Sequence, residues 1–213
     1  MPDPPPLVIV GAGGLGRGVA ALVEAVNANG RTWELLGFAD DDEGLQNASV
    51  MGYPILGDVE WLSEQSDLRF VVAIADAPSR RGIANTLRPA SLSPTTLTHP
   101  SVSLHRTTDV GAGTIIRKGV ATAVDIRIGP HAILNMECTL GHDATLAPLS
   151  TLHPGVHISG RAHIGKEATL GTGAVVLPGT TVGPNATVGA GAVVTEDLPP
   201  GCTAVGVPAR PVS

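Results

Sequence analysis

The sequence predicts a mixed fold in which a Rossmann-like α/β half domain precedes a parallel β-helix. A six-residue repeat runs without a slip from residue 110 to residue 194. A glycine-rich loop stands between an apolar run and a helical pattern near the N-terminus. Aromatic residues are only 2% of the chain, so the core must be aliphatic. We expect the half domain at 1–97, the β-helix at 98–196 and a C-terminal tail at 197–213.

The N-terminal half domain is predicted from the order of its first elements. Leu7–Val10 is an apolar run that suits a buried strand, and it leads into the loop GAGGLG at residues 11–16. Residues 17–26 have the apolar spacing of one helix face, and Leu35–Phe38 reads as a second strand that ends at three aspartates. Strand, glycine loop, helix, strand and acidic tip together are typical of a Rossmann-like unit.

This arrangement indicates a nucleotide site. Glycines let the backbone approach a diphosphate, whose charge is stabilised by N–H groups at the helix N-terminus, and Asp40 stands where a ribose hydroxyl would bind. The alternative is a tight turn that binds no ligand. The region is long enough for half of a dinucleotide fold, which favours a nucleotide-linked ligand over NAD. The expected substrate contacts are Gly11, Gly13, Gly14, Asp40 and Asp41.

Three further elements are expected before the repeat begins. Residues 53–58 read as a turn that starts a helix, because they contain Pro54 and Gly57. Phe70–Ala75 reads as a third buried strand, and Ser79–Leu87 reads as a helix.

The repeat itself predicts the β-helix. From Val110 to Val194, fourteen of the fifteen residues at six-residue steps are aliphatic, and the exception, Thr122, is β-branched. Four residues after each of them the side chain is mostly small or slim, and the residue directly after them is often glycine. Three hexads make a coil of about eighteen residues, so the aliphatic residues of about five coils stack into one core. Gly and Asn at the corners are expected to accept positive φ angles.

Charge and composition exclude several partners. The formal net charge of −6 and a pI near 5.6 argue against a nucleic-acid partner. Two isolated cysteines make no disulfide framework, and Cys138 falls at an inward position of the repeat. No apolar run approaches the length that spans a bilayer, and the first residues lack the features of a signal peptide. We therefore expect no membrane insertion and a cytoplasmic location.

The strongest candidate for chemistry is His142, which is followed by Asp143. It occupies an outward corner position of the repeat, where a neighbouring carboxylate can prepare an imidazole for proton abstraction near neutral pH. An ordinary solvent-facing corner residue is the alternative. Residues eighteen apart stack, and no histidine stacks on another histidine, so no metal site is expected within one chain. His153 is either a second acid/base or a bulky corner residue.

Taken in order along the chain, several motifs resemble the bacterial sugar O- and N-acetyltransferases of the NeuD and PglD type, in the hexapeptide-repeat acyltransferase superfamily. The resemblance covers nearly the full length. The matching segments are Val10–Gly14, Phe38–Asp41, Pro54–Gly57, Leu134–Asn135, Gly141–Asp143, His153–Val156, Ser159–Gly160, Val193–Thr195, Pro199 and Gly206–Arg210.

The resemblance implies a left-handed β-helix, a homotrimer with acetyl-CoA in the grooves between neighbours, and a nucleotide-linked amino sugar bound by the first domain. It implies that His142 is the general base, that Asp143 orients it and that Asn135 positions the acceptor. It also implies that backbone amides near three corner residues line the pantetheine channel and that the C-terminal tail lies near the nucleotide of the cosubstrate. These cosubstrate contacts are Gly160, Thr172, Ala190 and Pro208.

One departure from the family pattern is Leu15, which stands where members often have a histidine beside the sugar phosphates. The expected activity is N-acetylation of a 4-amino sugar in bacterial surface glycan biosynthesis. O-acetylation of sialic acid or of another small acceptor is the first alternative. A non-enzymatic solenoid scaffold and a zinc hydratase are the others.

Overall fold

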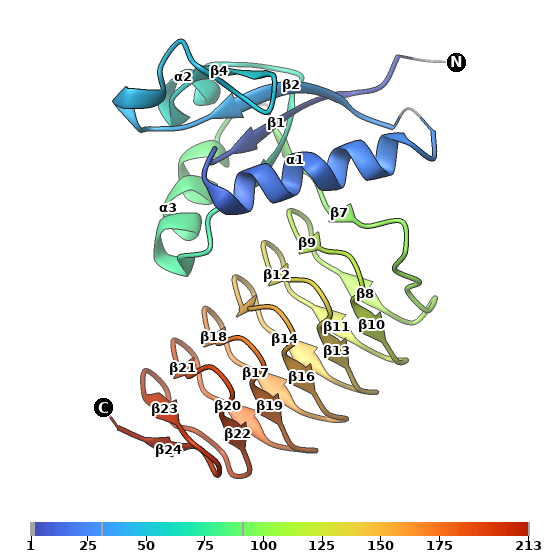
Figure 1. Ribbon diagram of the computed structural model, residues 1–213, viewed down its shortest axis with the longest axis vertical. Helices are drawn as coiled ribbons and strands as arrows, with labels where there is room; N and C mark the ends of the chain where they lie inside the picture. Colours follow the sequence, from blue (N-terminus) through green and yellow to red (C-terminus); the bar gives the residue numbers. More distant parts are fainter. Residues whose placement is uncertain (1–2, 31, 91, 213) are drawn as a thin grey trace. The chain divides into compact units, whose positions relative to one another are not determined.

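The computed structural model describes residues 3–30, 32–90 and 92–212 (Figure 1). The chain divides into two compact units, residues 1–100 and residues 101–213. Each unit has its own hydrophobic core. The predicted tail, 197–213, lies within the second unit.

The first unit is a six-stranded sheet with the order β3-β4-β2-β1-β5-β6. All neighbours run parallel except β3 and β4. Its strands are β1 Pro6–Val10, β2 Glu34–Ala39, β3 Ser49–Val50, β4 Tyr53–Gly57, β5 Arg69–Val72 and β6 Ser93–Pro94. Its helices are α1 Gly14–Asn27, α2 Val59–Ser63 and α3 Ala77–Leu87, with a 3-10 turn, η1, at Glu43–Leu45.

The position of β1 determines where this unit can bind a ligand. Leu7–Val10 is fully buried, as expected for a central parallel strand that is covered on both faces. The chain leaves β1 through α1 to pair β2 on one side, and it later returns to pair β5 on the other side. Ligands of open α/β sheets bind at such a switch point, outside the carboxyl ends of the strands. Those ends carry the glycine loop after β1 and Asp40 after β2.

The segment predicted as a turn at residues 53–58 is instead the strand β4. Pro54 and Gly57 are turn-forming residue types, but Ile55 is buried and pairs with Phe38 of β2. Long-range pairing therefore outweighs the local turn preference. The predicted helix does follow, with the Asp58 side chain accepting the Trp61 N–H at 2.7 Å. The third strand ends at Val72 rather than at Ala75.

The second unit is a stack of coils whose short strands form three sheets, and neighbouring strands run parallel except for the last pair along the chain (Figure 1). Successive coils pair at a spacing of eighteen residues, as in Leu134 with Leu152. The strands from the end of the first unit onward are β7 Leu97–Thr98, β8 Asp109–Val110, β9 Ile115–Ile116, β10 Ala121–Thr122, β11 Arg127–Ile128, β12 Ile133–Leu134, β13 Thr139–Leu140, β14 Thr145–Leu146, β15 Thr151–Leu152, β16 His157–Ile158, β17 His163–Ile164, β18 Thr169–Leu170, β19 Val175–Val176, β20 Thr181–Val182, β21 Thr187–Val188, β22 Val193–Val194, β23 Thr203–Val205 and β24 Arg210–Pro211.

The core of this unit is built as the repeat predicts. The aliphatic residues of the hexads point inward, and the slim residues four positions later are fully buried, Ala144, Ala162 and Cys138 among them. Burial raises the pKa of the Cys138 thiol to about 11, so it is a core residue rather than a nucleophile.

The corners differ from the expectation in one respect. Positive φ angles fall three residues after each aliphatic position, at Gly113, Asp125 and Asp143 for example, and not at the glycines directly after it. Glycine is required directly after the aliphatic position for a steric reason, because a Cβ atom on Gly129 or Gly141 would overlap the backbone of the next coil. Close stacking of coils, rather than backbone freedom, therefore selects glycine there.

The stacking also continues past residue 196, where the sequence predicts the tail to begin. Leu198 bridges Val182, and β23 pairs with β21 so that Ala204 lies beside Val188. These pairs are sixteen residues apart instead of eighteen. The turn after β22 is two residues shorter than the corresponding turns of the earlier coils. The last strands are therefore out of phase with the six-residue repeat, and counting in steps of six does not find them. Within the described residues, no helix is both long and apolar enough to cross a lipid bilayer.

Candidate active site

His142 and Asp143 form a side-chain pair at the corner after β13. The His142 Nδ1 lies 2.7 Å from the Asp143 Oδ2, and the two side chains are 52% and 55% exposed. Asp143 adopts a left-handed φ of 60°, which aspartate tolerates better than most residues. A carboxylate can only accept, so the bond places the Nδ1 proton toward Asp143 and leaves Nε2 with a lone pair. An imidazole held in this way can accept a proton at its exposed Nε2.

Gly160, one coil further on, lies directly against the imidazole. A Cβ atom added to Gly160 would stand 2.6 Å from the His142 Nε2 and 2.8 Å from its Cε1. The missing side chain therefore makes room for the ring in the orientation that the Asp143 bond sets. On the other side of His142, Val124 is 40% exposed in the preceding coil, so the pair has apolar surface beside it.

Asn135, predicted to position the acceptor, is buried and follows β12 in a different sheet from β13. Its Nδ2 donates to the Leu152 carbonyl oxygen at 3.0 Å, and its Oδ1 accepts from Arg117 at 3.3 Å. Within the described residues, no hydrogen bond joins it to His142. Burial lowers the pKa of Arg117. Sequence reasoning missed Arg117, although the eighteen-residue column places it under Asn135.

The residues expected to hold the cosubstrate fall on two corners of the β-helix. Thr172 and Ala190 are exposed and stack on each other, with the Gly191 N–H donating to the Thr172 carbonyl oxygen at 2.8 Å. Gly160 belongs to the corner that carries His142. Pro208 is exposed in the C-terminal segment. One chain therefore does not gather these four residues at a single corner.

The glycine loop of the first unit contains two kinds of glycine. Gly11 has a φ of 98°, and a Cβ atom there would lie 2.6 Å from the Ile74 side chain. A Cβ atom on Gly16 would overlap the Gly11 carbonyl oxygen, so close packing requires glycine at both positions. A Cβ atom on Gly13 or Gly14 would instead meet nothing within 4 Å. Among the residues that the structure describes, no contact requires glycine at these two positions, whereas close approach of a ligand to the backbone would.

Both side-chain oxygens of Asp40, the predicted ribose contact, accept backbone N–H groups. Its Oδ2 accepts the Ala12 N–H at 2.7 Å, and its Oδ1 accepts the Asp42 N–H at 3.0 Å. Asp40 therefore fastens the glycine loop to the end of β2. Asp41 is exposed and holds the start of α2, because its Oδ1 accepts the Val59 N–H at 2.9 Å.

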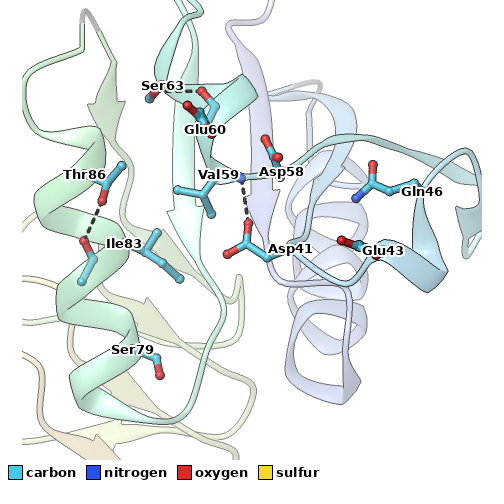
Figure 2. A pocket seen from close by; sticks show the side chains of 11 residues that line it. Asp41, Glu43, Gln46, Asp58, Val59, Glu60, Ser63, Ser79, Ile83 and Thr86 are labelled. Carbon is cyan, nitrogen blue, oxygen red and sulfur yellow. Dashed lines mark hydrogen bonds between the residues drawn. The ribbon is translucent and has the colours of Figure 1, made fainter.

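A cleft opens at the carboxyl ends of the strands of this unit. Its inner cavity, about 240 Å³, is bordered by Gly11, Asp40 and Ile74. Its outer cavity, about 880 Å³, extends between α2 and α3 (Figure 2). The two cavities share Asp41, Val59, Ser79 and Ile83, so they form one continuous cleft. Within the described residues, no group of three His, Cys, Asp or Glu side chains is placed to hold a metal ion.

A nucleotide-type α/β unit joined to a hexapeptide β-helix with an exposed histidine–carboxylate pair defines the class of hexapeptide-repeat acyltransferases. Family models support this class. The PglD N-terminal domain matches residues 6–87, and the bacterial transferase hexapeptide (six repeats) matches residues 161–196. No curated protein sequence matches the chain.

Solved structures extend the match over the whole chain. A perosamine N-acetyltransferase from Caulobacter crescentus, a histidine-to-asparagine variant with CoA and GDP-perosamine, is 34% identical, with a TM-score of 0.87 over 97% of this chain and 96% of that chain. The acetyltransferase domain of PglB from Neisseria gonorrhoeae with acetyl coenzyme A is 31% identical, with a TM-score of 0.90 over 98% and 100%. WeeI from Acinetobacter baumannii is 28% identical, with a TM-score of 0.85 over 97% and 99%.

The chain belongs to the PglD-type family of hexapeptide-repeat acyltransferases. The resemblance seen in the sequence is therefore confirmed. The fold class, including the left-handed winding of the β-helix, is confirmed with it.

Proposed function

We propose that this enzyme transfers the acetyl group of acetyl-CoA directly to the amine of a nucleotide-linked 4-amino sugar, in bacterial surface glycan biosynthesis. The observation that carries the proposal is the His142–Asp143 pair, with Nδ1 held at 2.7 Å and Nε2 lying over Gly160. Within the described residues, no hydrogen bond or ion pair engages Nε2. The relatives that bind CoA or acetyl-CoA and GDP-perosamine support the choice of substrates.

The residues of the pair account for the proton movements. His142 Nε2 takes a proton from the sugar amine while the amine nitrogen bonds to the thioester carbon. Asp143 stabilises the imidazolium that results, because its carboxylate already accepts the Nδ1 proton. When the carbon–sulfur bond breaks, the imidazolium returns the proton to the departing thiolate. His142 thus ends neutral, and the amide and free thiol are the products.

A homotrimer follows from the same proposal. The expected cosubstrate contacts fall on two corners of one β-helix, so a groove between neighbouring chains would unite Gly160 of one with Thr172 and Ala190 of the next. Val124 and Leu177, 40% and 37% exposed beside the His142 corner, suit burial at such an interface. The expected mass in solution is three times 21.5 kDa, measured by light scattering after gel filtration. A monomer would leave these contacts apart and contradict the groove.

The first unit would hold the nucleotide. The N-terminus of α1 has no side-chain cap and no acidic residue in its first turn, and Arg17 is exposed there. Free helix N–H groups and a cation favour an anion such as a diphosphate. Open space over Gly13 and Gly14 lets it approach.

The test is a thiol-release assay with acetyl-CoA against a panel of nucleotide-linked 4-amino sugars. We expect turnover with one of them, which also identifies the acceptor. Turnover with free sialic acid alone would instead establish the O-acetyltransferase alternative. Thiol release with none of the acceptors would favour the scaffold.

A further inference from the structure

The hydrogen-bonding character of the cleft between α2 and α3 limits which nucleobase it can accept. Four carboxylates border its outer cavity, those of Asp41, Glu43, Asp58 and Glu60, and within the described residues no lysine or arginine does so. An ionised carboxylate only accepts hydrogen bonds. A diphosphate would be repelled there, so the charged part of a nucleotide belongs at the N-terminus of α1 and its neutral part in the cleft.

The remaining polar side chains of the cleft have few hydrogens to offer. The hydroxyl groups of Ser63, Ser79 and Thr86 donate to protein oxygens at 2.7, 2.6 and 3.2 Å. Gln46 donates one amide hydrogen to the Asp40 carbonyl oxygen at 2.9 Å. The lining therefore presents lone pairs almost throughout, and a ligand that fits it must supply the hydrogens.

The cleft also has apolar sides. Val59 at the start of α2 and Ile83 on α3 border both cavities, and Figure 2 shows their side chains pointing toward each other. Such a pair suits the two faces of a flat ring. A protonated amine has the required hydrogens but no flat apolar face, so it uses only part of this lining.

We infer that the cleft binds a guanine base, so that the substrate is a guanosine-diphosphate-linked amino sugar. The inference rests on the proposed function and narrows its substrate class. Guanine presents two adjacent donors, N1–H and the 2-amino group, which match the two oxygens of one carboxylate. Uracil presents a single N–H between two carbonyl oxygens, and those oxygens would face the carboxylates of the cleft.

Glu43 and Glu60 are the carboxylates assigned to this contact. One side-chain oxygen of Asp41 accepts the Val59 N–H at 2.9 Å, and one of Asp58 accepts the Trp61 N–H at 2.7 Å, both at the N-terminal end of α2. Within the described residues, neither Glu43 nor Glu60 has a side-chain hydrogen bond or ion pair. Their whole carboxylates are therefore available to a pair of donors, while the second oxygens of Asp41 and Asp58 suit ribose hydroxyls.

Calorimetric titration of the full-length protein with GDP, IDP, UDP and ADP tests the assignment of guanine to the cleft. IDP lacks only the 2-amino group of GDP. We expect GDP to bind at least ~10-fold more tightly than IDP and UDP, since a hydrogen bond to a charged acceptor accounts for about that ratio. Equal binding of GDP and IDP, or tighter binding of UDP, would overturn the guanine assignment and leave the proposed function intact. Binding of none of the four would overturn both.

Variants give the second arm. The double variant Glu43→Gln/Glu60→Gln replaces two carboxylates by amides and removes two negative charges. Glu64→Gln, at the end of α2 and outside the cleft, is the control for the loss of charge. We expect GDP binding to weaken ~10-fold while UDP binding is unchanged or tighter. If the acids acted only as repulsive charges, the double variant would tighten all four diphosphates equally, which would contradict the assignment.

Discussion

Replacing His142 with alanine is expected to lower kcat in the thiol-release assay by ~10²–10⁴-fold, the range that general acid–base groups contribute. The side chain is half exposed and lies outside the core, so the thermal midpoint of unfolding should stay within a few degrees. The KM for acetyl-CoA should change little, because the imidazole acts on the proton of the acceptor amine. Steady-state rates and a melting curve on the same preparation measure both effects.

Asp143→Asn is the matched companion variant. The amide oxygen can still occupy the place of Oδ2, but the negative charge that stabilises the imidazolium is removed. We expect a smaller loss of kcat than for His142→Ala. If His142→Ala retains more than a tenth of kcat, the base lies elsewhere.

Gly160→Ala is expected to produce the second-largest effect, a fall in kcat of roughly 10–100-fold, since small misplacements of a catalytic group have costs of this order. The added Cβ would lie 2.6 Å from the His142 Nε2, so the ring must rotate away from the position that the Asp143 bond sets. Gly160 has no left-handed φ, so alanine meets no backbone strain. The loss should therefore appear in kcat far more than in stability.

A double-mutant cycle separates this effect from damage to the coil or to the cosubstrate channel. If Gly160 acts through His142, adding Gly160→Ala to His142→Ala should cause almost no further loss of kcat. Two independent losses that multiply in the double variant would show instead that Gly160 contributes by another route. Calorimetric binding of CoA to the single variant distinguishes that route, because a channel residue would weaken CoA binding directly.

Much of the β-helix could be predicted from local periodicity. Each hexad repeats the same inward aliphatic residue, and residues eighteen apart must stack, so the exposed position of His142 and its column with Gly160 follow from counting. The strand, glycine loop and helix at residues 7–26 were equally readable, because their signals lie within a short segment. The two-residue shortening of the turn after Val194 was not, since only the pairing of β23 with β21 reveals it.

What the sequence by itself determined is the architecture and the location of the histidine, because both depend on a regular spacing along the chain. Only the tertiary structure decided how side chains from distant segments share their hydrogen bonds. The Asp40 side chain accepts the N–H of Ala12, twenty-eight residues away, and the Asn135 side chain donates to the carbonyl oxygen of Leu152, seventeen residues away. The cleft is likewise a tertiary feature, since its acids and apolar sides come from the loop after β2, from α2 and from α3. Spacing along the chain specifies which residues repeat, whereas contacts between segments determine which hydrogen-bonding groups of each residue can still bind a substrate.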